Sequence, residues 1–337
     1  MADLSSWPLV RSRGRMKQED GRGPSYTVPC DDYVHVVEFS PFDCGAAPSL
    51  LAYGGSQYVV VGTCLFQEED TEVDGVEFTA LRVFHHGVRV DALAWSPESR
   101  LDQLPQVIRF CTAAADRNLR LVTSDLQDTH EVKVMEGHTD YVNHLVFEPT
   151  EGKQIASVKP EAVQNTPPRY TAGPLRRPDS SPRRGNPISG RPAPLLRVIV
   201  TTLWDLDGNL TTSFLLRSPG MSVCWHPEEI FKLMVAEKSG VVRFYNLITQ
   251  QALLSLDSGQ SPLMSADWCL ANTIKVGAVT GNDWVIWDIT RSSYPQEKRP
   301  VHSSGGQGPM RIYSPPLGAL EKSAASYWST TLVTHSL

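Results

Sequence analysis

The chain has 337 residues, of which 41% are hydrophobic and 20% charged, and its formal net charge is −6. This length and hydrophobic content suffice for one full-sized core, and the negative charge argues against a general nucleic-acid-binding surface. The longest apolar runs, such as residues 58–62, are too short to cross a membrane. We therefore expect no direct nucleic-acid binding and no direct membrane insertion.

The chain begins with a short basic leader. Residues 1–15 contain Arg11, Arg13 and Arg15 and lack the continuous apolar core of a secretory signal. We expect this segment to be disordered, and the repeated part of the chain to begin at Met16.

A strand-like unit that ends in an aromatic residue and a turn then recurs along the chain. The aromatic markers are Phe39, Trp95, Phe147, Trp225 and Trp268, and they are 56, 52, 78 and 43 residues apart. Periods of about 40 to 50 residues are typical of β-propeller blades. The spacing of 78 indicates that a foreign segment interrupts the third unit.

Each unit divides into four short strands. In the fourth unit these are residues 221–225, 231–237, 241–247 and 252–256, and a tight turn at Lys238–Gly240 joins the second to the third. The fifth unit repeats this order, and no stretch shows a sustained apolar period of 3.6 residues. The sequence therefore predicts an all-β propeller with about five four-stranded blades over residues 16–302.

The foreign segment in the third unit is the block 159–197. It holds nine prolines, seven arginines and one lysine against two carboxylates, which gives a local charge of 8 − 2 = +6. Proline cannot donate to a sheet ladder, and few large apolar side chains are present to offset the ordering entropy. We expect a disordered insertion in the hairpin between strands 155–158 and 197–208. It is either an alternatively spliced or mis-joined exon that is merely tolerated or a functional segment. In the second case residues 176–184 offer proline-directed serine sites, a basic nuclear-targeting patch or a phosphate-binding surface.

Several dipeptides resemble the WD40 family. They are Gly137-His138 before the third inner strand, and Trp204-Asp205 and Trp287-Asp288 at the ends of third strands. The resemblance implies a buried network of a histidine, a strand serine or threonine, a turn aspartate and a tryptophan, so we expect these residues to be structural. The other units lack the Trp-Asp pair and carry Val61-Gly62, Val122-Thr123 and Tyr245-Asn246 at that position.

Longer strings, at 32–42, 52–64, 84–102, 218–240 and 281–302, resemble the propeller nucleoporins of the Y-shaped scaffold of the nuclear pore. That family has seven blades. The resemblance implies a scaffold role in pore assembly and nucleocytoplasmic transport, and a location at the nuclear envelope and, in mitosis, at kinetochores. It also implies nucleoporin 160 and other Y-complex nucleoporins as partners, and neither a cofactor nor a small-molecule substrate.

The tail, residues 303–337, does not match this pattern. It has no recognisable inner strand and no Trp-Asp, and its 35 residues can donate at most a strand or two. Five units leave the outer faces of the first and last without partners. We therefore expect a largely irregular tail and an incomplete or open propeller that aggregates or depends on a partner.

Catalytic and metal-binding motifs are missing. The sequence has no G-x-S-x-G elbow and no phosphate-binding glycine loop, so we expect no enzyme. Scattered cysteines without a C-x-x-C pair predict free thiols and no zinc site. A WD40 substrate receptor of a cullin-type ubiquitin ligase is the alternative function. It is weakened because Arg291 follows Trp287-Asp288 one residue later than the Trp-Asp-x-Arg motif of such receptors requires. The cysteines are Cys30, Cys44, Cys64, Cys111, Cys224 and Cys269.

Overall fold

The structure is a computed structural model. It describes residues 11–14, 27–42, 48–159, 199–300, 310–313 and 329–332, except for the single positions 68, 71, 103, 128, 139 and 271. For 11–14, 199, 310–313 and 329–332 it describes the backbone alone. All regular elements in these ranges are strands, and none of the described residues forms a helix long and apolar enough to span a membrane.

Five antiparallel sheets follow one another along the chain, each built from consecutive strands. Blade one contains β2 (Val36–Phe39), β3 (Ser49–Gly54), β4 (Tyr58–Phe66) and β5 (Val76–His85). Blade two contains β6 (Val90–Trp95), β7 (Ile108–Ala114), β8 (Leu119–Ser124) and β9 (His130–Met135). Blade three contains β10 (His144–Phe147), β11 (Gln154–Val158), β12 (Ile199–Asp205) and β13 (Leu210–Leu216).

The last two complete blades have the same order. Blade four contains β14 (Gly220–Trp225), β15 (Lys232–Glu237), β16 (Val241–Asn246) and β17 (Gln251–Asp257). Blade five contains β18 (Leu263–Trp268), β19 (Lys275–Thr280), β20 (Asp283–Asp288) and β21 (Glu297–Pro300). The predicted tight turn between β15 and β16 is present. Gly240 there has φ +99°, and a Cβ on it would lie 2.1 Å from the carbonyl oxygen of Gln260.

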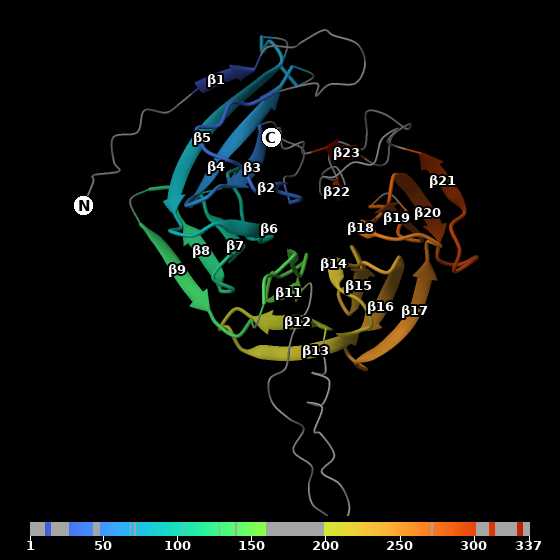
Figure 1. Ribbon diagram of the computed structural model, residues 1–337. Helices are drawn as coiled ribbons and strands as arrows, with labels where there is room; N and C mark the ends of the chain where they lie inside the picture. The colour runs from blue at the N-terminus through green and yellow to red at the C-terminus, as the bar shows by residue number, and fades with distance from the viewer. Residues whose placement is uncertain are drawn as a thin grey trace, which may run out of the picture.

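The blades stand in a ring with the first strand of each blade nearest the axis (Figure 1). Neighbouring inner strands contact one another in the order β2, β6, β10, β14 and β18. Each aromatic marker is the last residue of its inner strand. The prediction of an all-β propeller with five four-stranded blades is confirmed.

Hydrophobic contacts between neighbouring blades form the core. Four clusters of buried side chains each combine residues of two successive blades. In the first, Phe84 of blade one packs edge-to-face on Phe110 of blade two, with ring centroids 5.4 Å apart. The indole of Trp95 in blade two donates to the carbonyl oxygen of Glu38 in blade one at 3.0 Å. A blade therefore buries its apolar faces against its neighbours, which is the basis of stability in repeat folds.

Two strands outside the five blades occupy the tail. β22 (Met310–Tyr313) pairs antiparallel with β23 (Ser329–Leu332), and β22 lies beside β18 and β19 of blade five. Figure 1 shows this hairpin between blade five and blade one. The sequence predicted at most a strand or two in this tail, and the rest of 303–337 lies outside the described residues.

One expectation about the leader was wrong. Residues 1–15 were expected to be disordered, but Arg11–Gly14 form β1, which pairs with Val76–Thr79 of β5 and extends blade one to five strands. The physical reason is that an outermost strand presents unpaired backbone donors and acceptors that accept another strand of any extended sequence. Residues 1–10 and 15–26 lie outside the described part of the chain.

The insertion separates β11 from β12, which nevertheless pair in regular register from Gln154–Asp205 to Val158–Thr201. Its expected first residue, Lys159, belongs to the blade instead. The side chain of Lys159 is buried, and its carbonyl oxygen accepts a hydrogen bond from Gly220 at 3.1 Å. Residues 160–198, including nearly all of the predicted insertion, lie outside the described residues.

Candidate functional site

A buried hydrogen-bonded network occupies the interior of blade three. The indole Nε1 of Trp204 donates to Ser157 Oγ at 3.0 Å, and Ser157 Oγ lies 2.6 Å from Thr202 Oγ1. The Nε2 atom of His138 lies 3.3 Å from the same Ser157 hydroxyl. The imidazole also packs on the indole, with ring centroids 4.8 Å apart. All four side chains are buried.

The local sequence explains how this network is assembled. Gly137 precedes the histidine with φ +138°, and a Cβ on it would lie 2.9 Å from the Trp204 ring. Glycine therefore allows the backbone to pass directly over the indole. In blade three the histidine, the strand serine and the tryptophan of the WD40 pattern thus meet in space. The expected turn aspartate is not among the described residues of this network. The insertion stands where that aspartate was expected, and the hydroxyl of Thr202 joins the network instead.

The Ser157–His138 pair has the residue types of a catalytic dyad, but its surroundings are those of a core. Ser157 is 0% exposed, so no substrate can reach its hydroxyl. Burial, with a smaller contribution from the charge of Lys159, lowers the pKa of His138 to about 3. The imidazole is therefore neutral at physiological pH and serves the network as a hydrogen-bonding and packing group.

The two aspartates of the Trp-Asp dipeptides close turns. Asp205 accepts hydrogen bonds from the backbone and side-chain nitrogens of Asn209 at 2.8 and 2.9 Å. Asp288 accepts from the backbone and hydroxyl of Thr290 at 3.0 and 2.6 Å. Hydrogen bonds from these partners lower the pKa of both carboxyls. These contacts lie in the turns that follow the third strands of blades three and five.

The second tryptophan differs from the first. Trp287 on β20 is 0% exposed and packs in the cluster between blades four and five. Its Nε1 has no hydrogen-bond partner among the described residues. In blade four, Tyr245 takes the place of the tryptophan and packs on Phe214 of blade three, with ring centroids 4.5 Å apart. The tryptophan of blade three therefore joins a polar network, whereas the corresponding aromatic residues of blades four and five pack in apolar clusters.

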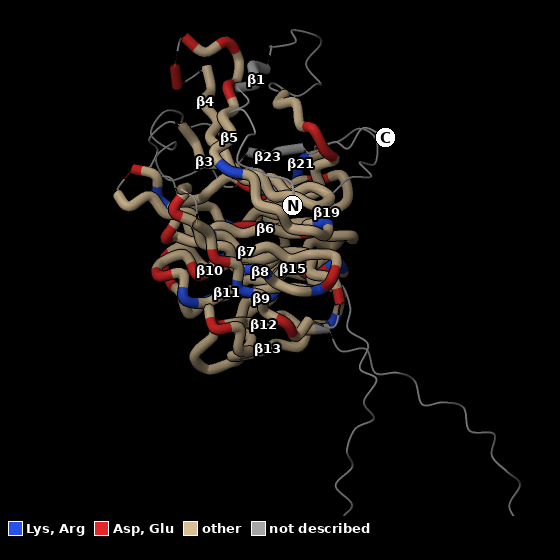
Figure 2. The backbone as a smooth tube through the Cα atoms, turned by 90° about the vertical axis from the view of Figure 1, so that its left-hand side faces the viewer, with Lys and Arg blue, Asp and Glu red and all other residues tan. Residues whose placement is uncertain are grey.

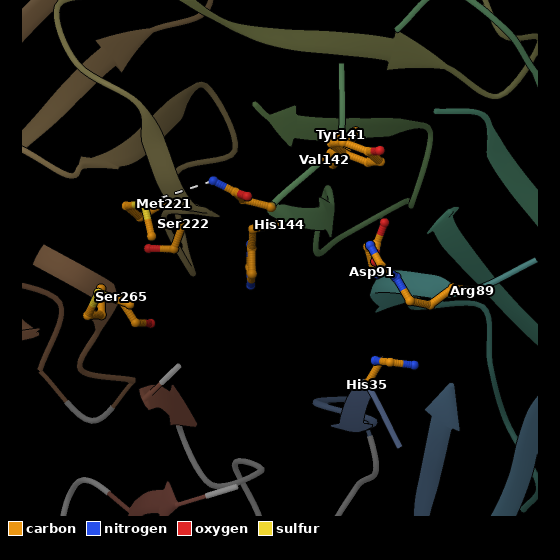
Figure 3. A pocket seen from close by; sticks show the side chains of 11 residues that line it. His35, Arg89, Asp91, Tyr141, Val142, His144, Met221, Ser222 and Ser265 are labelled. Atoms are coloured by element: carbon orange, nitrogen blue, oxygen red, sulfur yellow. Dashed lines mark hydrogen bonds and ion pairs between the residues drawn. The ribbon is translucent and has the colours of Figure 1, made fainter. Parts of the chain in front are cut away.

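A cavity of about 300 Å³ lies on the ring axis at the end where the inner strands begin. All five blades contribute to its wall. Figure 3 shows His144 pointing into the space, His35 and the Arg89–Asp91 pair on one side of it, and the sulfur and hydroxyl groups of blades four and five on the other. The lining residues are His35, Arg89, Asp91, Tyr141, Val142, Asn143, His144, Met221, Ser222, Met264 and Ser265.

Contacts at the cavity wall fix several of these side chains. Arg89 Nε donates to Asp91 Oδ1 at 2.7 Å, and the side-chain amide of Asn143 donates to the carbonyl oxygen of Gly220 at 2.7 Å. The backbone nitrogen of Val223 donates to Nδ1 of His144 at 3.4 Å. The wall of the cavity is therefore held by contacts within and between blades.

Chemically, the cavity offers imidazole, guanidinium, carboxylate and hydroxyl groups that can bind another molecule. It contains no cysteine, and no group of three or more metal-ligating side chains occurs among the described residues. Elsewhere on the molecule, acidic and basic residues are interspersed over the strands and turns (Figure 2). Recognition of another molecule at this site would depend on hydrogen bonds and charge.

The chain is similar in sequence to known proteins. No protein-family model matches it. Nucleoporin Nup37 of Homo sapiens is 58% identical over 287 residues, which cover 85% of this chain and 77% of the relative. This chain belongs to the nucleoporin Nup37 family. Nup37 of Mus musculus is 57% identical over the same shares, and Nup37 of Drosophila melanogaster is 32% identical over 65% of this chain and 57% of its own length.

A solved structure with a similar fold is consistent with the propeller architecture of this Nup37-family chain. A chain from a crystal structure of the mitotic checkpoint complex superposes with a TM-score of 0.54. The match covers 83% of this chain and 68% of that chain, at 17% sequence identity. Such low identity supports the propeller fold alone.

Sequence reasoning did not predict the axial cavity. A signal is nevertheless present, because the residue four positions before each aromatic marker lines the cavity in all five blades. Each marker ends the inner strand of its blade, so a fixed count from it reaches the same depth of the ring. These residues are His35, Asp91, Asn143, Met221 and Met264.

Proposed function

We propose that this chain is a structural scaffold subunit of the outer-ring Y-complex of the nuclear pore. In this role it supports pore assembly and nucleocytoplasmic transport at the nuclear envelope. The observation that carries the proposal is the 58% identity to human nucleoporin Nup37 over 85% of the chain. The five-bladed ring supports it, because a propeller is a rigid body whose loops and edges offer several contact surfaces.

The mechanism in this proposal is assembly through protein contacts. The propeller docks on nucleoporin 160 and thereby joins the other Y-complex nucleoporins, and it accompanies them to kinetochores in mitosis. The packing between blades suits such a role, since clusters shared by successive blades hold the contact surfaces in a fixed arrangement. No cofactor and no small-molecule substrate take part.

The chain acts in this proposal without catalysis of its own. The serine and histidine that meet in blade three are enclosed in the core, as the 0% exposure of Ser157 illustrates. The cavity on the axis offers an arginine, imidazoles and hydroxyl groups for hydrogen bonding to another molecule. Both features support an interaction module.

The alternative is a substrate receptor of a cullin-type ubiquitin ligase, and no observation favours it. Arg291 extends from the end of blade five, where its Nε lies 3.2 Å from Asp288 Oδ2. Its side chain is 72% exposed. This contact closes a turn within the blade, which accounts for the arginine without a ligase adaptor.

Affinity purification of the tagged full chain from cultured cells, with quantitative mass spectrometry, tests the proposal. We expect nucleoporin 160 and other outer-ring nucleoporins to be enriched, and immunofluorescence to show a nuclear rim in interphase. The Trp287→Ala variant is the control, because it removes core packing without changing the surface. Its recovery of all nucleoporins should fall together. Enrichment of a cullin adaptor without outer-ring nucleoporins would contradict the proposal and support the alternative.

A further inference from the structure

We propose that the axial cavity is a docking site for an acidic peptide segment of a partner protein, with an aspartate or glutamate side chain seated against Arg89. This inference goes beyond the scaffold role, since it assigns a ligand class to a site that this role does not require. Its volume, about 300 Å³, is at the lower end of the range of ligand pockets. It can accommodate a side chain with part of its backbone.

Arg89 provides the main donor. Its Nε donates to Asp91 at 2.7 Å, and this contact fixes the plane of the guanidinium group. The side chain is 48% exposed, and the structure gives its two terminal nitrogens no other partner among the described residues. A guanidinium fork held in this way matches the two oxygens of a carboxylate.

Further donors come from the neighbouring blade. The Nδ1 atom of His144 accepts a hydrogen bond from the backbone nitrogen of Val223, so in the neutral imidazole the proton is on Nε2. Figure 3 shows this ring directed into the cavity. Tyr141 is 43% exposed and adds a phenol, and the guanidinium of Arg117 lies 5.8 Å from the centroid of its ring. Cationic and donor groups therefore outnumber the single carboxylate of Asp91 at this side of the cavity.

Asp91 is the reason to expect a peptide at this site and not a simple anion. Its Oδ1 accepts from Arg89, whereas its Oδ2 is buried and has no partner among the described residues. A buried acceptor without a donor is costly. An inorganic anion can accept from the donors of this site but brings no backbone N–H for Asp91 Oδ2. An acidic peptide brings a carboxylate for Arg89 and a backbone N–H for Asp91 Oδ2, so it satisfies both.

The position of the cavity suits a peptide that arrives from outside. It opens at the end of the ring where the inner strands begin, and each of the five blades contributes a lining residue four positions before its aromatic marker. The wall is therefore built by the repeat itself. A peptide on the axis would contact several blades at once.

Fluorescence anisotropy on the purified full chain tests the proposal. The probes are a labelled peptide Gly-Glu-Glu-Glu-Gly and its neutral isostere Gly-Gln-Gln-Gln-Gly, at one ionic strength. We expect the acidic peptide to bind at least tenfold more tightly than the neutral one. The Arg89→Gln variant should lose about tenfold in affinity for the acidic peptide, and Arg89→Lys should lose less because it keeps the charge without the fork.

Arg299→Gln is the matched control. It removes the same charge from β21 on the outer edge of blade five, where the Arg299 side chain is 71% exposed, and its affinity should equal that of the unaltered chain. Thermal melting of each variant verifies that it folds, which is expected because Arg89 is half-exposed. Inorganic phosphate should compete far more weakly than an unlabelled acidic peptide.

Three results would overturn the proposal. They are equal affinity for the two peptides, an equal loss with Arg299→Gln and Arg89→Gln, and competition by phosphate as strong as that by the peptide. The assay uses synthetic peptides and the isolated chain. Its failure is therefore distinguishable from a failure of the pore role, which is measured through nucleoporins recovered from cells.

Discussion

Trp204 Nε1 donates to Ser157 Oγ at 3.0 Å across the strand pair that the insertion interrupts. The two residues are 47 positions apart in the chain, yet their strands are direct neighbours in the sheet. The network they form with His138 and Thr202 ties β12 to β11 and to the segment before β10. Blade three thus holds its register through buried polar contacts as well as apolar packing.

Replacement of the central hydroxyl should destabilise the protein. In Ser157→Ala the Nε2 atom of His138 loses its partner, whereas the indole of Trp204 keeps Thr202 Oγ1 at 3.2 Å, and a buried polar group without a partner costs about 1–3 kcal/mol. Chemical denaturation of the two proteins measures the change in the free energy of unfolding.

The neighbouring Thr201→Val variant is the matched control. Thr201 is 0% exposed and its hydroxyl has no partner among the described residues, so removal of this hydroxyl should be neutral or stabilising. Equal destabilisation by the two substitutions would show that the network is not what stabilises blade three.

The tryptophan of blade five should act through packing alone. Trp287→Ala removes a fully buried aromatic side chain, which typically costs about 3–5 kcal/mol, and should lower the melting temperature. Trp287→Phe should cost less, because the indole Nε1 has no hydrogen bond to lose among the described residues. Calorimetry measures stability, and binding assays with each partner should show that all are weakened together. Selective loss of one partner at unchanged stability would instead place Trp287 in an interface.

Acid should destabilise the fold through buried histidines. Burial lowers the pKa of His138 to about 3 and that of His86 to about 4, whereas the ordinary value is 6.5. Between these values the unfolded chain binds more protons than the folded one. The stability is therefore fully present above pH 6.5 and is lost as the pH falls toward 3, by about 1.4 kcal/mol per pH unit for each group.

Urea denaturation across pH 3 to 7 measures this slope. In His138→Gln the slope should be shallower by the contribution of one group, even though the variant is less stable at every pH. An identical slope in His138→Gln and in the unaltered chain would contradict the burial of His138 as a neutral group.

Removal of the insertion should preserve blade three. The pairing of Val158 with Thr201 is regular on both sides of residues 160–198, and the sequence predicts that this block makes no stabilising contacts. Each halving of loop length lowers the closure cost by about 0.6 kcal/mol. Replacement of 39 residues by a five-residue turn should therefore raise stability by up to about 2 kcal/mol. A glycine-serine replacement of equal length should leave it unchanged, and a fall in both would mean that the block contributes to the fold.

The blades were predictable because each one repeats the same local pattern. Phe147 and Trp225 end inner strands, as the spacing of aromatic markers indicated, and alternation with turn residues defined the other strands. Strand β1 and the hairpin of β22 and β23 were harder to predict, since pairing at an edge depends on which backbone groups the assembled sheets leave open. That information exists only in three dimensions.

The polar features were only partly predictable. The dipeptides led to His138 and Trp204, but Thr202 joins the network because it lies opposite Ser157 in the register of β11 and β12. The cavity depends on a position shared by five blades, and no single motif marks it. His35 and Asp91 are recognised as equivalent positions only when all five units are aligned on their aromatic markers.

The most direct test mixes the purified full chain with purified nucleoporin 160 in sedimentation velocity experiments. Five blades and a two-stranded hairpin leave sheet edges available for pairing, so the chain alone should self-associate as its concentration rises. Addition of nucleoporin 160 should replace these species with one stable complex. A chain that stays a monodisperse monomer would contradict the expected exposure of its edges. A chain that forms no complex with nucleoporin 160 would contradict the proposed role as a scaffold subunit of the pore.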